Sequence, residues 1–108
     1  MAQHTFMGIH LSVPTAFGIL ATSWPFAGIS IGEEGVELIA RCPLRSEWYS
    51  PLDEIAFVKA DERSALIARA DGSLAFFRYF RRNHDAIVTA LCGCGLQIEQ
   101  VERVDRIT

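Results

Sequence analysis

Short runs of alternating hydrophobic and polar residues fill most of the first eighty positions and predict a series of β-strands. In the clearest run, Ile29 and Ile31 fall on one face and Gly28 and Ser30 on the other. Turn-forming residues separate the runs, as expected for antiparallel strands joined by short loops. Strands are predicted at residues 17–22, 27–31, 36–41, 47–49, 55–60, 65–69 and 74–79. Residues 4–11 and 96–101 also have extended patterns, the latter typical of an edge strand.

Two hairpins stand out between these strands. Gly32-Glu33-Glu34-Gly35 supplies a charged loop bounded by glycines, and Asp71-Gly72 is the clearest two-residue hairpin turn in the chain. After the first hairpin, the pattern directs Val36, Leu38 and Ala40 inward, and in the strand at 55–60 Ile55 and Phe57 are expected to share one face.

The pattern changes to helical spacing after Phe80. A helix is predicted from His84 to about Cys92, with Asn83 as N-cap and Gly93 or Gly95 as the stop. One helix face, with the spacing i, i+3, i+4 and i+7, is expected to pack on the sheet: His84, Ile87, Val88 and Leu91. Cys92 is expected under the helix and Cys94 near its end.

Composition is ordinary for one globular domain. The chain has 108 residues, of which 50% are hydrophobic and 21% charged, a balance that excludes disorder as the dominant state. The net charge of −3 argues against a nucleic-acid-binding protein, because such proteins are normally basic. The charges are unevenly placed, since residues 1–32 contain no Lys, Arg, Asp or Glu.

Cysteine usage favours a reducing compartment. Cys42, Cys92 and Cys94 are an odd number, and no basic segment precedes an apolar core at the N-terminus, so a cytoplasmic protein is expected. The single-residue spacing of Cys92 and Cys94 is not that of a metal site, and neither a metal nor a cofactor is expected.

Several segments together resemble a known family. Trp24-Pro25-Phe26-Ala27, Ile29, Ile31 and Gly35-Val36-Glu37-Leu38 look like the opening hairpin of small bacterial proteins with a pleckstrin-homology-like (GRAM-like) fold. The phrase Ser50-Pro51-Leu52-Asp53-Glu54-Ile55, the Asp71-Gly72 hairpin, and Ala90-Leu91 with Gly95 follow in the family's order.

The resemblance implies a mainly β protein with one C-terminal α-helix. The expected architecture is a bent antiparallel sheet of seven strands, a partly open barrel, capped by the helix. The core would span about residues 15–98, with 1–14 as an N-terminal extension and 99–108 as a polar tail, of which residues 102–108 are expected to be loosely held. Members of such families bind phosphoinositides, peptides or partner subunits, so the fold does not select a function.

Arg78, Arg81 and Arg82 are the best candidate anion-binding residues, since guanidinium groups pair with phosphate or carboxylate oxygens. The alternative is a solvated link in which Tyr79 or Phe80 faces the core and the arginines pair with glutamates. Lipid-binding members of the family carry basic residues mainly in the first hairpin, where this chain has Glu33 and Glu34.

The charge-free N-terminal part is the candidate protein interface. An uncharged strand at a sheet edge can pair with a second chain, and aromatic residues are favoured at interfaces. The candidate interface residues are Phe6, Ile9, Leu11, Trp24, Trp48 and Tyr49. Asp53 and Glu54 are adjacent and would point to opposite faces of a strand, and no nucleophile–base arrangement appears, so an enzyme is not expected.

Two hypotheses follow. The first is a non-enzymatic interaction module that self-associates, with a homodimer as one form, or docks a protein partner. The second is a protein that binds a membrane surface or an anionic ligand through the three arginines.

Overall fold

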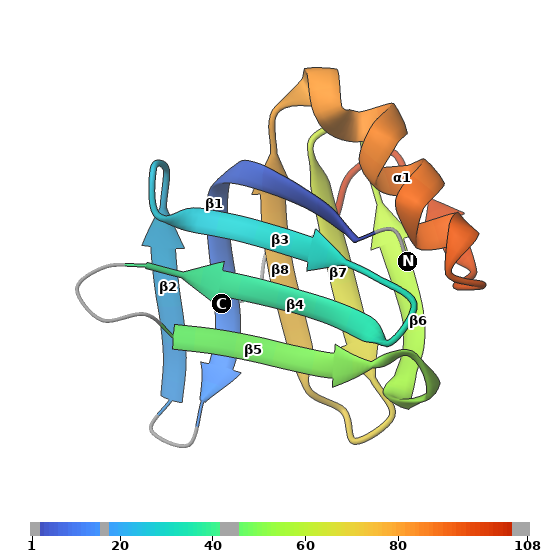
Figure 1. Cartoon of the computed structure of the whole chain (residues 1–108), viewed down its shortest axis with the longest axis horizontal. Coiled ribbons are helices and arrows are strands. Elements are labelled where there is room, and N and C mark those ends of the chain that lie inside the picture. The colour runs from blue at the N-terminus through green and yellow to red at the C-terminus, as the bar shows by residue number, and fades with distance from the viewer. Residues whose placement is uncertain (1–2, 16–17, 42–45, 105–108) are drawn as a thin grey trace.

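The computed structural model describes residues 3–15, 18–41 and 46–104, which form nine strands, two 3-10 turns and one helix (Figure 1). The strands are β1 (His4–Thr15), β2 (Gly18–Ser23), β3 (Ala27–Ile31), β4 (Gly35–Ala40), β5 (Ser46–Pro51), β6 (Ile55–Ala60), β7 (Ser64–Arg69), β8 (Leu74–Tyr79) and β9 (Ile98–Gln100). The 3-10 turns are Leu52–Glu54 and Arg81–Asn83, and the helix α1 is His84–Gly93.

The strands form one open sheet in the order β5-β4-β3-β1-β8-β7-β6-β9, with β2 paired to β1 beside this path. In Figure 1, β3, β4 and β5 cross in front of β1, β8, β7 and β6, so the sheet is bent into two layers. A mainly β fold with one C-terminal helix is therefore confirmed. The expected number of strands is wrong: β1 and β9 join the seven predicted strands, so the described residues contain nine.

β1 lies in the middle of the strand order, and residues 4–14 are not an extension of the fold. Its first residues pair with β3, and its later residues pair with β2 on the same side and with β8 on the other. The sequence pattern did not place β1 in the middle of the sheet because alternation reports which face of a strand is buried and not which strands pair with it.

β1 turns from one layer to the other at Gly8. The pairing with β8 shifts register between Gly8 and His10, as at a β-bulge. A side-chain carbon at Gly8 would lie 2.8 Å from the carbonyl oxygen of Arg78 and still closer to the Phe77 ring. Glycine is therefore required here by the close approach of β8.

The core lies between the two layers and under α1. Ile29, Ile31, Val36 and Leu38 of the front layer are at most 1% exposed, and Ala40 is equally buried, as the alternation predicted. The core is completed from the other layer and the helix by Leu11, Val13, Val58, Ala65, Ile67, Ala75, Phe77, Tyr79, Ile87 and Leu91.

The prediction that Ile55 and Phe57 share a face is wrong. The register between β6 and β7 shifts between these two residues, so the extra residue reverses the alternation. Ile55 packs against the core, whereas Phe57 is 44% exposed and Val58 takes the buried position.

The helix begins at His84 and is followed by Gly95 with a φ of +89°, as the sequence predicted for its start and stop. Asn83 makes no side-chain capping bond, because the preceding 3-10 turn holds it in a helical conformation. Ile87 and Leu91 are fully buried, while Val88 is only partly buried. Among the described residues, no helix is long and apolar enough to cross a membrane.

Residues 99–104 are held more firmly than a loose tail. β9 pairs in parallel with β6 at the end of the sheet. The Val101 amide donates to the Ala60 carbonyl over 2.9 Å, and the Val104 amide donates to an Asp61 carboxylate oxygen over 2.8 Å. Val104 is 7% exposed, so the fold extends at least to this residue.

Replacing Gly8 with alanine is expected to destabilise the protein by about 1–3 kcal/mol, because the methyl group must displace the Phe77 ring and the β8 backbone. Chemical denaturation monitored by tryptophan fluorescence would measure this. Gly28→Ala is the matched control, since a carbon there would lie 3.6 Å from the nearest atom, an ordinary contact. Equal stability of the two variants would contradict the proposed role of Gly8.

Candidate docking surface

The three candidate arginines lie at the junction of β8 and α1, where each has a different neighbour. Arg78 is on the outer side of β8. Arg81 forms an exposed ion pair of 3.4 Å with Glu62, and the Arg82 guanidinium lies 4.8 Å from the centre of the Phe80 ring. Arg81 thus follows the solvated-link alternative, in which an arginine pairs with a glutamate, and such an exposed pair contributes little to stability.

Tyr79 points inward from the same junction and is fully buried. Its hydroxyl donates to the Asp61 carbonyl over 2.7 Å and lies 3.0 Å from Nδ1 of His84. Burial raises the pKa of Tyr79 above the ordinary 10.0, and the Asp61 carboxylate raises it further. This hydroxyl therefore ties β8 to the β6–β7 turn and to the first residue of α1.

Two of the candidate interface residues belong to the core. Leu11 is fully buried on β1, and Trp48 is 7% exposed on the inner face of β5. The Arg69 guanidinium covers the Trp48 ring from 5.9 Å. Neither side chain is available to a partner, which corrects their assignment to a surface.

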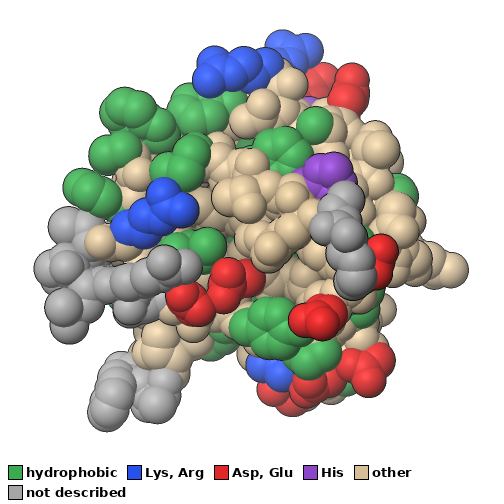
Figure 2. All heavy atoms as spheres, viewed as in Figure 1, with side chains coloured by type: hydrophobic (Ala, Val, Ile, Leu, Met, Phe, Trp, Pro, Cys, Tyr) green, Lys and Arg blue, Asp and Glu red, His purple; other side chains and the backbone are tan. Residues whose placement is uncertain are grey.

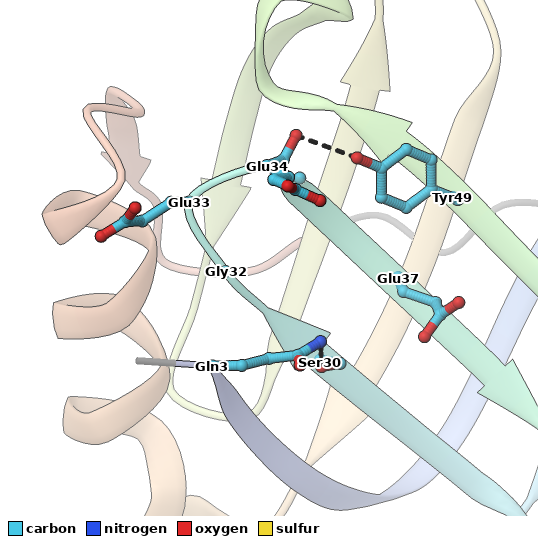
Figure 3. A pocket seen from close by; sticks show the side chains of 8 residues that line it. Gln3, Ser30, Gly32, Glu33, Glu34, Glu37 and Tyr49 are labelled. Carbon is cyan, nitrogen blue, oxygen red and sulfur yellow. Dashed lines mark hydrogen bonds between the residues drawn. The ribbon is translucent and has the colours of Figure 1, made fainter. Parts of the chain in front are cut away.

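Phe6 and Tyr49 lie apart from each other. Phe6 is partly buried and packs on the core near α1. Tyr49 is 47% exposed on the outer face of β5, and its hydroxyl donates to the Glu34 carbonyl over 3.0 Å (Figure 3).

Trp24 and Phe26 project from the turn between β2 and β3. They are 60% and 40% exposed, large values for aromatic side chains. The turn is firmly held, because the Trp24 amide donates to the Ile9 carbonyl over 2.8 Å and the Arg41 amide donates to the Phe26 carbonyl over 3.0 Å. Figure 2 shows hydrophobic side chains gathered over this turn, at the upper left.

A hollow of about 370 Å³ lies beside Trp24 and brings together residues from both predicted sets. Its lining residues are Ile9, His10, Ser23, Trp24, Phe76 and Arg78. His10 is held by Ser23 and Ser12, whose hydroxyl oxygens lie 3.1 Å and 3.2 Å from its ring nitrogens. Within the described residues, no acidic side chain forms an ion pair with Arg78.

The outer edge of β2 adjoins this turn. Among the described strands β2 pairs with β1 alone, and none of its six residues is charged. Its side chains alternate between partly buried and exposed, with Leu20 on the core and Ile19 56% exposed. We call this edge, with the side chains of Ile19, Trp24 and Phe26, the Trp24 surface. The absence of charge in residues 1–32 indicated an interface in this part of the chain. The sequence pattern predicted β1 as the edge strand, whereas the structure has β2 there.

Other chemistry is sparse in the described part of the chain. No group of three or more His, Cys, Asp or Glu side chains there is arranged to hold a metal ion. Cys92 is exposed and does not lie under α1, whereas Cys94 packs on the core and donates to the Gly32 carbonyl over 3.2 Å. Position 92 faces outward because Ile87 and Leu91 define the buried side of the helix. Cys42 lies outside the described residues.

No protein-family model matches this chain, and no curated protein sequence matches it.

Tyr79→Phe is expected to lower the free energy of unfolding by on the order of 1–3 kcal/mol at neutral pH, since buried hydrogen-bonding groups lose their partner. Above about pH 10 the unfolded tyrosine ionises while folded Tyr79 stays protonated, so the unfolded state binds fewer protons. The free energy of unfolding of the native protein must therefore fall as the pH rises above about 10. The free energy of unfolding of Tyr79→Phe should fall less over the same pH range. Urea unfolding at pH 7 to 11 measures both effects.

Tyr49→Phe is the matched control, because it removes a hydroxyl from an exposed tyrosine with one backbone partner. It should have a smaller effect at neutral pH than Tyr79→Phe. An identical alkaline decline in the native protein and Tyr79→Phe would show that Tyr79 does not cause it.

Proposed function

We propose that this protein is a non-enzymatic interaction module that docks a protein partner through the Trp24 surface, with a second copy of the chain as the simplest partner. The observation that carries the proposal is the uncharged outer edge of β2 next to the exposed Trp24 and Phe26. Natural edge strands usually carry charges, prolines or bulges that prevent pairing, and exposed aromatics are enriched at protein interfaces. β2 has none of these protective features.

We further propose that the fold is pleckstrin-homology-like. With β2 and β9 set aside, the order β5-β4-β3-β1-β8-β7-β6 contains seven strands that pair only antiparallel, and α1 follows the last of them in sequence. The sequence resemblance likewise implies seven antiparallel strands followed by one helix, although it placed residues 1–14, most of β1, outside the core. In this view, β2 is an insertion that adds an edge to the domain.

The chemistry of the first long hairpin favours a protein over a lipid as partner. The β3–β4 turn carries Glu33 and Glu34, both exposed. Acidic side chains at this position would repel an anionic lipid head group. A cytoplasmic location suits the proposal, since Cys92 and Cys94 are free thiols.

A second copy fits the edge of β2 by symmetry. Two identical edge strands can pair antiparallel about a two-fold axis, and the same patch then serves both subunits. In such a pair the exposed side chains of Ile19 and Trp24 would lie beside the new strand contact and lose apolar exposure, which stabilises the dimer.

Ala21→Lys is expected to abolish this association. Ala21 is an exposed residue in the middle of β2, so lysine there leaves the core intact and places a charge at the edge. Multi-angle light scattering over a wide concentration range should show the native protein changing from monomer to dimer and the variant staying monomeric.

Ala56→Lys is the control, because it adds the same charge at an exposed alanine of β6, with β1, β8 and β7 between it and β2. It should dimerise like the native protein. A native protein that is monomeric at every concentration would exclude self-association, and equal dimerisation of both variants would exclude the β2 edge.

A second function, binding of an anionic group, is supported by Arg78 alone among the three arginines. Arg78 lines the hollow beside Trp24 and forms no ion pair with a described acidic residue, whereas Arg81 already pairs with Glu62. A phosphate or carboxylate held by Arg78 would lie next to an apolar wall formed by Ile9 and Trp24.

Sedimentation with vesicles that contain anionic phospholipid tests this second function. Binding is expected at low salt, with a loss at high salt because screening shortens the range of the attraction. Arg78→Ala should reduce the bound fraction several-fold and Arg81→Ala much less. Absence of binding at low salt, or equal effects of the two variants, would contradict a site at Arg78.

A further inference from the structure

A second hollow, distinct from the Trp24 surface, runs between α1 and the start of β1. Its volume is about 670 Å³. Figure 1 shows the start of β1 beside α1. The lining residues of the hollow are His4, Phe6, Glu33, Asp85, Ala86, Thr89, Ala90, Gly93 and Cys94. We call it the α1 groove.

The α1 groove exists because the helix side that faces it has small residues. Ala86, Ala90 and Gly93 leave space that longer side chains would fill, and Phe6 supplies an aromatic wall from β1. Tyr79 holds the first turn of the helix through His84, and the buried Ile87 and Leu91 fix its orientation. The groove therefore has an apolar floor formed by Phe6, Ala86 and Ala90, and it is built on anchored elements.

The charged side chains around the α1 groove are acidic. Glu33 comes from the β3–β4 turn and Asp85 from the first turn of α1, and neither a lysine nor an arginine is among the lining residues. Both acids are exposed, so their charge is available to an incoming molecule. Burial raises the pKa of the Cys94 thiol, and the nearby Glu33 carboxylate raises it further.

Glu33 also belongs to a neighbouring acidic hollow on the outer face of β3, β4 and β5. This hollow has a volume of about 230 Å³ and is lined by Gln3, Ser30, Gly32, Glu33, Glu34, Gly35, Glu37 and Tyr49. Figure 3 shows Glu33 on the side of the hollow that faces the helix, with Glu34 and Glu37 farther along the sheet. The apolar groove thus continues into an acidic surface at Glu33.

We propose that the α1 groove binds a segment of a different protein that carries lysine or arginine side chains next to an apolar anchor. The anchor would lie against Phe6, Ala86 and Ala90, and the basic side chains would face Glu33, Asp85 and the acidic hollow. Apolar burial supplies affinity in such a contact, while complementary charge selects the partner and orients the segment.

A second copy of this chain is a poorer occupant than a separate protein. Its basic and aromatic segment, Phe80-Arg81-Arg82, is already engaged, since Arg81 pairs with Glu62 and Arg82 lies over Phe80. The α1 groove is also separate from the Trp24 surface in its residues and in its charge, so this proposal does not depend on the proposed self-association.

Fluorescence anisotropy with a labelled synthetic peptide, Lys-Arg-Lys-Gly-Leu-Phe-Gly, tests the proposal. Saturable binding is expected, weaker at high salt because the ionic contacts are exposed. Two control peptides separate the contributions, one with glutamate at the three basic positions and one with serine in place of leucine and phenylalanine. Both should bind at least tenfold more weakly, and equal binding of either would overturn the proposal, as would no binding of the first peptide.

Two protein variants test the location. Glu33→Lys reverses the shared charge and Ala86→Trp fills the groove from an exposed helix position, so each should weaken binding at least tenfold. The control Asp71→Lys, at an exposed position on the β7–β8 hairpin at the opposite end of β8 from α1, should not. Thermal unfolding confirms that the variants fold. The amide NMR chemical shifts of the native protein, followed as the first peptide is added, give a result that does not depend on variants. Changes at Phe6, Ala90 and Gly93 would support binding in the groove, and changes confined to other residues would overturn it.

Light scattering tests whether the α1 groove takes part in self-association. Ala86→Trp should leave the oligomeric state of the native protein unchanged. A loss of self-association in this variant would show that the groove holds a second copy, which would overturn the proposal of a separate protein partner.

Discussion

The bend of β1 is the constraint on which the rest of the structure depends. One strand pairs with β3 in the front layer and then with β8 and β2 in the other layer, so both halves of the core are organised by a single segment of backbone. The bend requires the close approach of Gly8 to β8, where any side chain would meet the Phe77 ring and the Arg78 carbonyl. This approach keeps β1 close to β8, and Leu11 and Val13 of β1 belong to the core between the layers.

The surfaces of possible functional importance follow from this bend and from the attachment of α1. When β1 leaves β3, the same side of β1 becomes available to β2, whose other edge meets no described strand. The turn that connects β2 to β3 then displays Trp24 and Phe26. On the other side of the molecule, the Tyr79 hydroxyl and the buried Ile87 and Leu91 hold α1 over the core, and the small residues of the helix leave the α1 groove open.

The two surfaces differ in chemistry, which bears on how the protein selects partners. The Trp24 surface is uncharged along β2 and has Arg78 in its adjacent hollow, whereas the α1 groove is bordered by Glu33 and Asp85. Figure 2 shows acidic side chains spread over the face formed by β3, β4 and β5. The two surfaces therefore favour partners of different charge, a basic segment at the α1 groove and an uncharged strand at the edge of β2. In our proposals, self-association uses the first surface and a basic segment uses the second.

The sequence by itself determined the elements and much of the core. Alternation located the strands around Ile29, Leu38 and Ile67, Asp71-Gly72 located a hairpin, and helical spacing with Gly95 located α1, since each of these signals is local. Only the tertiary structure decided that β1 is central, that the bulge in β6 exposes Phe57, and that Leu11 and Trp48 are core residues. It also decided that Arg78 lies near Trp24 and that Glu33 lies beside α1. These outcomes depend on which strands pair and where the sheet bends, and long-range pairing is set by the packing of the whole chain, which no local pattern records.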